Sequence, residues 1–175
     1  MPAYYTYLIS SLPMLSFGAR PPFSAQDFLR RCQGLIPDRE VRIIETVLNG
    51  GETVIEDAPV LKKWYQFDTS LRNELVMVRA SHKKIEPQKY LRGGHAEDAY
   101  LANVATLAAR NPLILEAEKI LDLNRWQAIE DFVKGHYFDL EVLFAYALEL
   151  SILLRWEKIS TQDKIAALEE VTKVA

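Results

Sequence analysis

Histidines carry the widest range of chemistry in this chain, because a neutral imidazole can bind a metal ion or transfer a proton. The three histidines, His82, His95 and His136, lack the i, i+4 spacing of a zinc-binding helix. The triplet His-Ala-Glu that begins at His95 matches the first part of a zinc deaminase signature. That signature also requires a Pro-Cys-x-x-Cys pair, and the chain has one cysteine, Cys32. We therefore expect no metal site and no cofactor.

Carboxylates, hydroxyls and glycines give no stronger signature. General acid–base chemistry needs carboxylates that converge in a dry cleft. The pairs at 130–131 and 169–170 are instead neighbours on expected helices, where adjacent side chains point apart. Ser81–His82 lies on an expected helix without the strained turn of a nucleophilic serine. Gly93–Gly94 lacks the Lys-Ser/Thr pair that completes a phosphate-binding loop, so no catalytic residue is predicted.

The overall charge argues against one class of partner. Lys and Arg together number 21 and Asp and Glu 24, which gives a net charge of −3. A dedicated nucleic-acid-binding protein is usually basic. The local basic cluster of Lys83, Lys84, Lys89 and Arg92 is more simply interpreted as a solvated connection. We therefore expect no nucleic-acid partner.

Cysteine usage and the apolar segments bear on the cellular compartment. A single cysteine cannot form an intramolecular disulfide, which favours a reducing compartment. The longest apolar segment, residues 140–154, carries Glu141 and Glu149 and is too short to span about 30 Å of hydrocarbon. No basic residue precedes the N-terminal apolar run, as one would in a signal peptide. We expect a cytoplasmic protein without a transmembrane segment.

Helical spacing and capping residues define the elements that must position any site. Ser24 with Asp27 resembles a capping box, and a long helix is expected from Pro59 to about Lys83. Three further residues are expected to cap helices: Asp122, Asp139 and Ser160. Breaks between helices are expected near Pro37, Gly50–Gly51, Gly93–Gly94, Pro112 and Gly135.

These elements predict a mainly α fold, a helical bundle of about seven to eight helices with an extended aromatic N-terminal segment. We expect a single domain over residues 1–175, in which two helical halves, 24–83 and 96–173, are joined by a looser connection over 84–95. Beyond the N-terminal segment, strand character is confined to Thr53–Ile55.

The N-terminal segment combines aromatic and aliphatic residues with prolines. Tyr5–Ser10 has strand character, and Pro13 and Pro21–Pro22 prevent the segment from continuing as a helix. Its large side chains can pack across the bundle of this chain or against a partner subunit. Four of them are candidates for a protein contact: Tyr4, Tyr5, Leu12 and Leu15.

The helix expected from Asp139 to Glu157 is the most apolar in the chain. One stripe, which includes Leu143 and Leu150, must face the core. Leu148 and Ile152 lie on the opposite side. This second stripe can be core as well, because such a helix is often central to a bundle, or it can meet another protein. We expect its partial exposure at a protein contact.

Three stretches of the sequence resemble a bacterial family of uncharacterised proteins that are encoded beside the subunits of V/A-type ATPases. They are YYTYLISSLPMLSFGARPPFSAQDFLRRC near the N-terminus, FDTSLRNELVMVRASHKK in the middle and FDLEVLFAYALELSILLRWEKIS towards the C-terminus. The resemblance spans nearly the whole chain. Its motifs are aromatic and aliphatic, and they imply V/A-type ATPase subunits as partners.

The sequence is also similar, more faintly, to the C/d subunit of V-type ATPases, the all-helical piece that seats the central stalk on the membrane rotor. The similarity lies in a long helix with Arg72–Asn73 and in an apolar helix with an internal Tyr146 that ends near Arg155. It implies that Arg72, Asn73 and Arg155 contribute to a protein contact.

Together these observations predict a non-enzymatic accessory, stalk or assembly component of a V/A-type ATPase that acts through helix-face contacts. Association with the inner face of the membrane would then be peripheral, through the partner complex. The alternative is a small hydrolase or transferase whose site forms only in three dimensions. A pocket with polar side chains in mutual contact would favour the enzyme, and a flat apolar patch would favour the binding protein.

Overall fold

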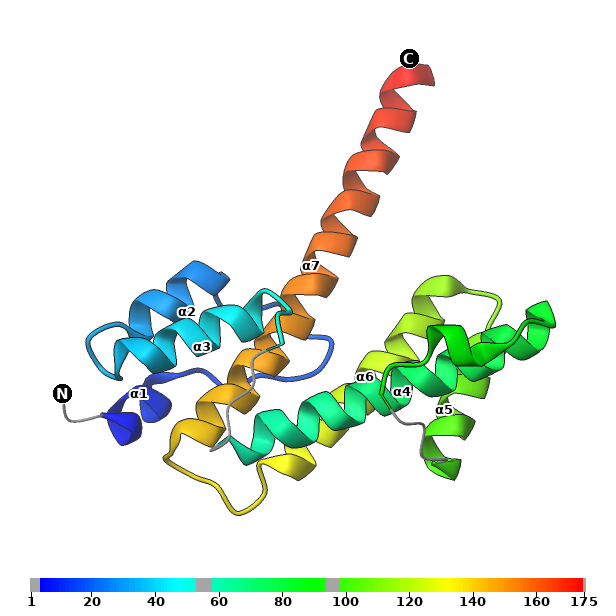
Figure 1. Cartoon of the computed structure of the whole chain (residues 1–175). Coiled ribbons are helices and arrows are strands. Elements are labelled where there is room, and N and C mark those ends of the chain that lie inside the picture. The colour runs from blue at the N-terminus through cyan, green and yellow to red at the C-terminus, as the bar shows by residue number, and fades with distance from the viewer. Residues whose placement is uncertain (1–3, 53–57, 94–97, 175) are drawn as a thin grey trace. The chain divides into compact units, whose positions relative to one another are not determined.

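The computed structural model describes residues 4–52, 58–93 and 98–174, and Figure 1 shows their arrangement. The fold is mainly α, as predicted: all named elements within these residues are helices, and an isolated β-bridge joins Gln33 to Ile36. The helices are α1 (Tyr5–Ser11), α2 (Ala25–Cys32), α3 (Asp38–Leu48), α4 (Pro59–Lys83), the 3₁₀ helix η1 (Pro87–Tyr90), α5 (Ala99–Arg110), α6 (Ile114–Phe132) and α7 (Leu140–Val174).

The chain divides into two compact units. The terminal unit comprises Met1–Val54 and Gly135–Ala175 and contains α1, α2, α3 and α7. The middle unit comprises Ile55–Lys134 and contains α4, η1, α5 and α6. The described part of the predicted connection over 84–95 lies within the middle unit, between α4 and α5. The strand character predicted for Thr53–Ile55 falls outside the described residues.

Several helix boundaries follow from the local sequence. The Ser24 hydroxyl accepts a hydrogen bond from the Asp27 amide at 3.2 Å, which is the predicted N-cap of α2. Asp139 likewise accepts from the Val142 amide at 3.2 Å at the start of α7. Helix α4 has the bounds expected from the sequence, with a proline in its first turn.

The sequence predicts an extended N-terminal segment, but part of this segment is helical. Tyr5–Ser11 forms α1, so the strand character assigned to Tyr5–Ser10 is wrong. These seven residues include no glycine or proline, and Pro13 lies beyond the helix end, where it interrupts no helical hydrogen bond. Helix α1 is anchored by Leu8, which is fully buried. Residues 12–24 are not helical, in agreement with their three prolines.

Two predicted caps lie inside longer helices. Asp122 is an interior residue of α6, and Ser160 is an interior residue of α7, which runs without interruption to Val174. Neither helix contains a glycine or proline that would stop it. Residues that favour an N-cap are tolerated within a helix when the backbone continues to bond and the side chain finds another partner. Asp122 has such a partner in Arg125.

Residues 12–24 are held within the terminal unit by an aromatic cluster. The rings of Phe28 and Tyr146 lie 5.1 Å apart between centroids, and Phe23 stacks on Phe28 at 6.0 Å. The Tyr146 hydroxyl donates to the Pro13 carbonyl at 3.0 Å. Arg31 covers the Phe23 ring at 5.1 Å, a cation–π contact. This part of the N-terminal segment therefore packs on α2 and α7 of its own chain.

Cys32 provides a direct test of the packing in the terminal unit. Its side chain is fully buried at the end of α2, and burial raises the pKa of Cys32 to about 12. We expect the folded protein to react with a thiol reagent at pH 8 at least about 100-fold more slowly than the denatured chain.

The same shift has a pH consequence with a defined sign. The folded state favours the neutral thiol, so this contribution to stability is complete below pH 9 and is lost as the pH rises towards 12. Mass spectrometry measures how fast the thiol reagent labels Cys32. Equal labelling rates for the folded and the denatured protein would contradict the burial of Cys32.

The middle unit is organised around α4, which packs against both α5 and α6. Its core consists of buried aliphatic side chains with four partly buried neighbours: Leu71, Leu75, Leu101, Val104, Ala105, Ala108 and Leu121, with Phe67, Val78, Ala117 and Ile120 around them. Asn73 fixes the chain after α4, because its side-chain amide donates to the Arg92 carbonyl at 2.9 Å and accepts from the Arg92 amide at 3.0 Å.

Candidate functional site

A cluster of ion pairs joins α4 to α6 in the middle unit. The Arg125 guanidinium donates to Asp68 at 2.9 Å and to Asp122 at 3.0 Å. Asp68 also pairs with Arg72, one turn further along α4, at 2.7 Å. The four side chains thus alternate in charge from the half-exposed Arg72 to Asp122, whose side chain is only 2% exposed.

Arg125 is the central member of this cluster. Burial on its own would lower the pKa of Arg125, but the charges and hydrogen bonds of Asp68 and Asp122 outweigh this effect and raise it. The guanidinium is therefore held in its charged form between two carboxylates. The charges of this cluster are paired with one another, and Arg125 and Asp122 have little contact with solvent. The cluster is therefore better suited to joining two helices than to proton transfer.

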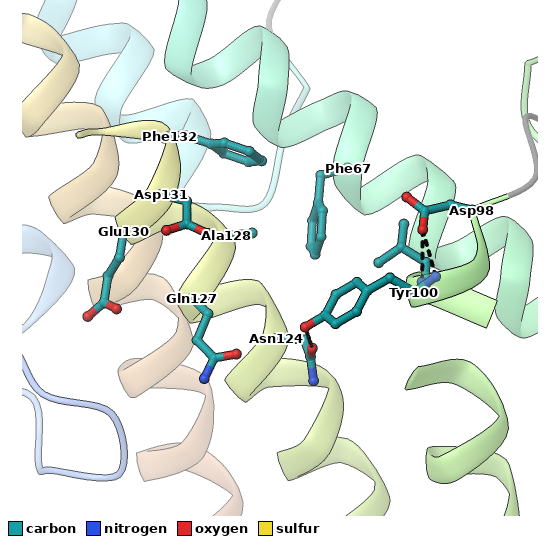
Figure 2. Close-up of a pocket in the computed structure, with 10 residues that line it drawn as sticks. Phe67, Asp98, Tyr100, Asn124, Gln127, Ala128, Glu130, Asp131 and Phe132 are labelled. Carbon is teal, nitrogen blue, oxygen red and sulfur yellow. Dashed lines mark hydrogen bonds between the residues drawn. The ribbon is translucent and has the colours of Figure 1, made fainter. Parts of the chain in front are cut away.

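A cavity of about 500 Å³ lies beside the first turn of α5 and the C-terminal half of α6. Figure 2 shows Phe67 and Tyr100 projecting between Asp98 on one side and the α6 residues on the other. Ten residues line the cavity: Phe67, Asp98, Tyr100, Leu101, Asn124, Gln127, Ala128, Glu130, Asp131 and Phe132.

Hydrogen bonds fix the polar side chains of the cavity. The Tyr100 hydroxyl donates to the Asn124 side-chain oxygen at 2.5 Å, which joins α5 to α6 across the cavity. Asp98 caps α5 by accepting from the Tyr100 and Leu101 amides at 2.9 and 3.1 Å. Glu130 accepts from the Trp126 indole at 2.9 Å. These side chains are therefore positioned before any ligand enters.

The lining suits binding better than covalent chemistry. Tyr100 and Asn124 are polar side chains in mutual contact within a pocket, which is the feature expected of an enzyme. However, a phenol that donates to an amide is not a nucleophile paired with a base. The ten lining residues include no serine, cysteine, histidine or lysine. What the lining offers is three carboxylates and three aromatic rings.

A second cavity, of about 310 Å³, is also confined to the middle unit. It is lined by residues of α4 and α5: Met77, Val78, Ser81, His82, Thr106 and Arg110. Ser81 and His82 are consecutive on α4 and so point in different directions. The Thr106 hydroxyl donates to the Ala102 carbonyl of its own helix at 2.8 Å. This cavity therefore presents no paired nucleophile and base.

The predicted contact residues are divided between the two units, with Arg72 and Asn73 in the middle unit and the others in the terminal unit. Tyr4 is 53% exposed, and Arg72 and Arg155 are also exposed. Tyr5, Leu12 and Leu15 are half-buried, and the Tyr5 hydroxyl donates to Glu40 at 2.6 Å.

Three of the predicted contact residues are inaccessible. Asn73 is buried, with its amide engaged by Arg92. Leu148 and Ile152 are 3% and 6% exposed, so the expected exposure of this stripe of α7 is wrong. A helix that is apolar around most of its circumference is usually buried on both sides. This agrees with the alternative interpretation of the sequence, in which the second stripe also belongs to the core.

Sequence reasoning overlooked both the ion-pair cluster and the cavity. The i, i+3 spacing of Asp122 and Arg125 could have indicated one ion pair. The contact between Arg125 and Asp68 spans 57 positions in the sequence and has no local signal.

Among the described side chains, no three His, Cys, Asp or Glu residues gather as a metal site. The described helices also include none with the length and apolarity to cross a membrane.

Comparison with known proteins yields one family. Residues 95–172, somewhat less than half of the chain, match the family model described as "Protein of unknown function (DUF2764)". The match covers α5, α6 and most of α7. No curated protein and no solved structure matches the chain.

Proposed function

We propose that this chain is a non-enzymatic accessory, stalk or assembly component of a V/A-type ATPase, and that it acts by presenting helix faces to other subunits. The link to the ATPase rests on the sequence resemblance at both ends and in the middle of the chain. Its place at the membrane would be peripheral, through the partner complex.

The observation that carries the contact role is the C-terminal part of α7. From Leu143 to Leu153 this helix is mostly buried, whereas Arg155, Glu157 and Lys158 are exposed. The backbone nevertheless remains helical to Val174. At about 1.5 Å per residue the 35 residues of α7 span roughly 50 Å. Figure 1 shows the end of α7 extending past α2 and α3 of the same unit.

The described side chains of α7 beyond Leu154 are mostly exposed, and isolated helices are marginally stable in water. Docking against another helix would supply the missing apolar contacts, as in helix-in-groove recognition. Exposed aromatic and aliphatic residues of the terminal unit provide further contact area: Tyr4, Tyr7, Met14, Tyr137 and Phe138.

Affinity purification from the native cell, followed by mass spectrometry, tests this proposal. We expect V/A-type ATPase subunits to co-purify with the full chain. A variant that ends after Glu157 should lose most of this recovery while its own melting temperature changes by only a few degrees, because the described side chains from Lys158 to Gln162 are exposed or half-buried. Absence of ATPase subunits from the full-chain sample would contradict the proposed function.

A further inference from the structure

The cavity of the middle unit has an excess of negative charge. Asp98, Glu130 and Asp131 are among its ten lining residues, and none of the ten is basic. The bonds that hold two of these carboxylates come from neutral donors: the amides of Tyr100 and Leu101 for Asp98, and the Trp126 indole for Glu130. These bonds fix the carboxylates in place without cancelling their charge. In both cases the bonds involve one carboxylate oxygen, Oδ1 of Asp98 and Oε1 of Glu130.

Aromatic rings supply the second feature of the cavity. Phe67 and Phe132 meet edge to face, with ring centroids 6.0 Å apart, and Tyr100 is held by its bond to Asn124. In Figure 2 the ring of Phe67 lies between Asp98 and α6, and the ring of Tyr100 reaches Asn124, while the carboxylates of Glu130 and Asp131 point away from both rings. Rings with a negative face beside carboxylates attract an organic cation by both cation–π and ionic interactions. A volume of about 500 Å³ is also in the usual range for a small-molecule site.

The chain itself places an ammonium group at the edge of this cavity. Lys134 Nζ pairs with Asp131 at 2.5 Å. The hydrogen bond and charge of Asp131, together with the charge of Glu130, raise the pKa of Lys134. The end of α6 is thus already an environment that favours the charged form of an amine.

From the rings, the carboxylates and the volume together we infer that this cavity binds an organic cation, that is, an ammonium or guanidinium group. The group can belong to a free polyamine or to a basic side chain of another polypeptide. Phe67, Tyr100 and Phe132 would contact its apolar stem, and Asp98 and Glu130 would attract its charge, because Asp131 is already paired with Lys134. This inference does not depend on the proposed ATPase association.

The test uses two probes with the full chain at low salt: spermidine, and a blocked Gly-Arg-Gly peptide. A neutral diol of similar length serves as the control ligand. Binding is followed through the NMR signal of the Trp126 indole N–H, which donates to Glu130 and so lies beside the cavity. We expect at least one of the cations to shift this signal saturably at millimolar concentration or below, and the diol to leave it unchanged. The tighter of the two cations identifies the source of the ligand.

Paired variants separate a site from general electrostatic attraction. Asp98→Asn with Glu130→Gln removes two charges but preserves the helix cap and the acceptor for Trp126. Asp38→Asn with Glu45→Gln removes two exposed charges from α3 of the terminal unit. We expect the cavity variant to bind at least tenfold more weakly and the α3 variant to bind within twofold of the parent protein.

Three outcomes would overturn the inference. The first is that neither cation shifts the indole signal saturably. The second is that both double variants weaken binding equally, which would indicate attraction by net charge alone. The third is that the cavity variant, shown to be folded by its thermal melt, binds as tightly as the parent protein.

Discussion

Leu148→Asp is expected to destabilise the folded protein severely and to lower its melting temperature. Leu148 is buried on α7, and Phe144, one turn before it, has no exposed surface. A carboxylate at this position would be taken out of water without a partner, and the lost packing would add to that penalty. The combined cost should exceed about 4 kcal/mol, a large part of the stability of a typical domain. Thermal melting followed by circular dichroism measures the effect.

Lys158→Asp is the matched control, because it places the same side chain on an exposed position of the same helix. Its effect should be within about 0.5 kcal/mol. A Leu148→Asp protein that melts like the parent would show that this stripe of α7 is accessible, as the sequence alone had suggested.

Arg125→Met should lower the free energy of unfolding by about 3–5 kcal/mol. The change removes the guanidinium that bridges Asp68 and Asp122. Asp68 keeps its pair with Arg72, but the carboxylate of Asp122 stays almost fully buried without Arg125. The energetic penalty is that of a buried carboxylate that has lost its guanidinium partner, and urea unfolding of the purified protein measures it.

Arg72→Met provides the comparison, since it removes the half-exposed cation from the same carboxylate of Asp68. Exposed pairs contribute about 0–1 kcal/mol, so this variant should be nearly as stable as the parent. Arg125→Met combined with Asp122→Leu should recover part of the lost stability, because both charges of the buried pair are then gone. Equal losses for Arg125→Met and Arg72→Met would refute the bridging role of Arg125.

The sequence predicts most helix boundaries correctly because these depend on local chemistry. Pro59 and Lys83 bound α4 as expected, and Ser24 and Asp139 form caps with their own neighbours in the chain. The prediction that Ser160 caps a helix is wrong, because local chemistry alone does not decide this boundary. A favourable cap residue does not start a helix when nothing before it ends one.

The candidate site could not be predicted in the same way, because it depends on contacts between distant residues. Asp68 and Arg125 meet only because α4 packs on α6. Likewise, Tyr100 bonds to Asn124 across the cavity only because α5 lies beside α6. The apolar pattern of α7 showed that two faces need neighbours, but it could not decide whether those neighbours belong to this chain or to another. The burial of Leu148 and Ile152 resolves that question for this helix.

We propose above that the exposed part of α7 contacts a V/A-type ATPase subunit. Photo-crosslinking in the native cell tests it most directly, with a benzophenone amino acid in place of Lys158 on α7 or of Arg42 on the exposed side of α3. We predict that position 158 gives an adduct whose mass spectrum contains peptides of an ATPase subunit, and that position 42 does not. Adducts at position 158 that contain no ATPase peptides, or identical adducts from both positions, would contradict a contact between α7 and the ATPase.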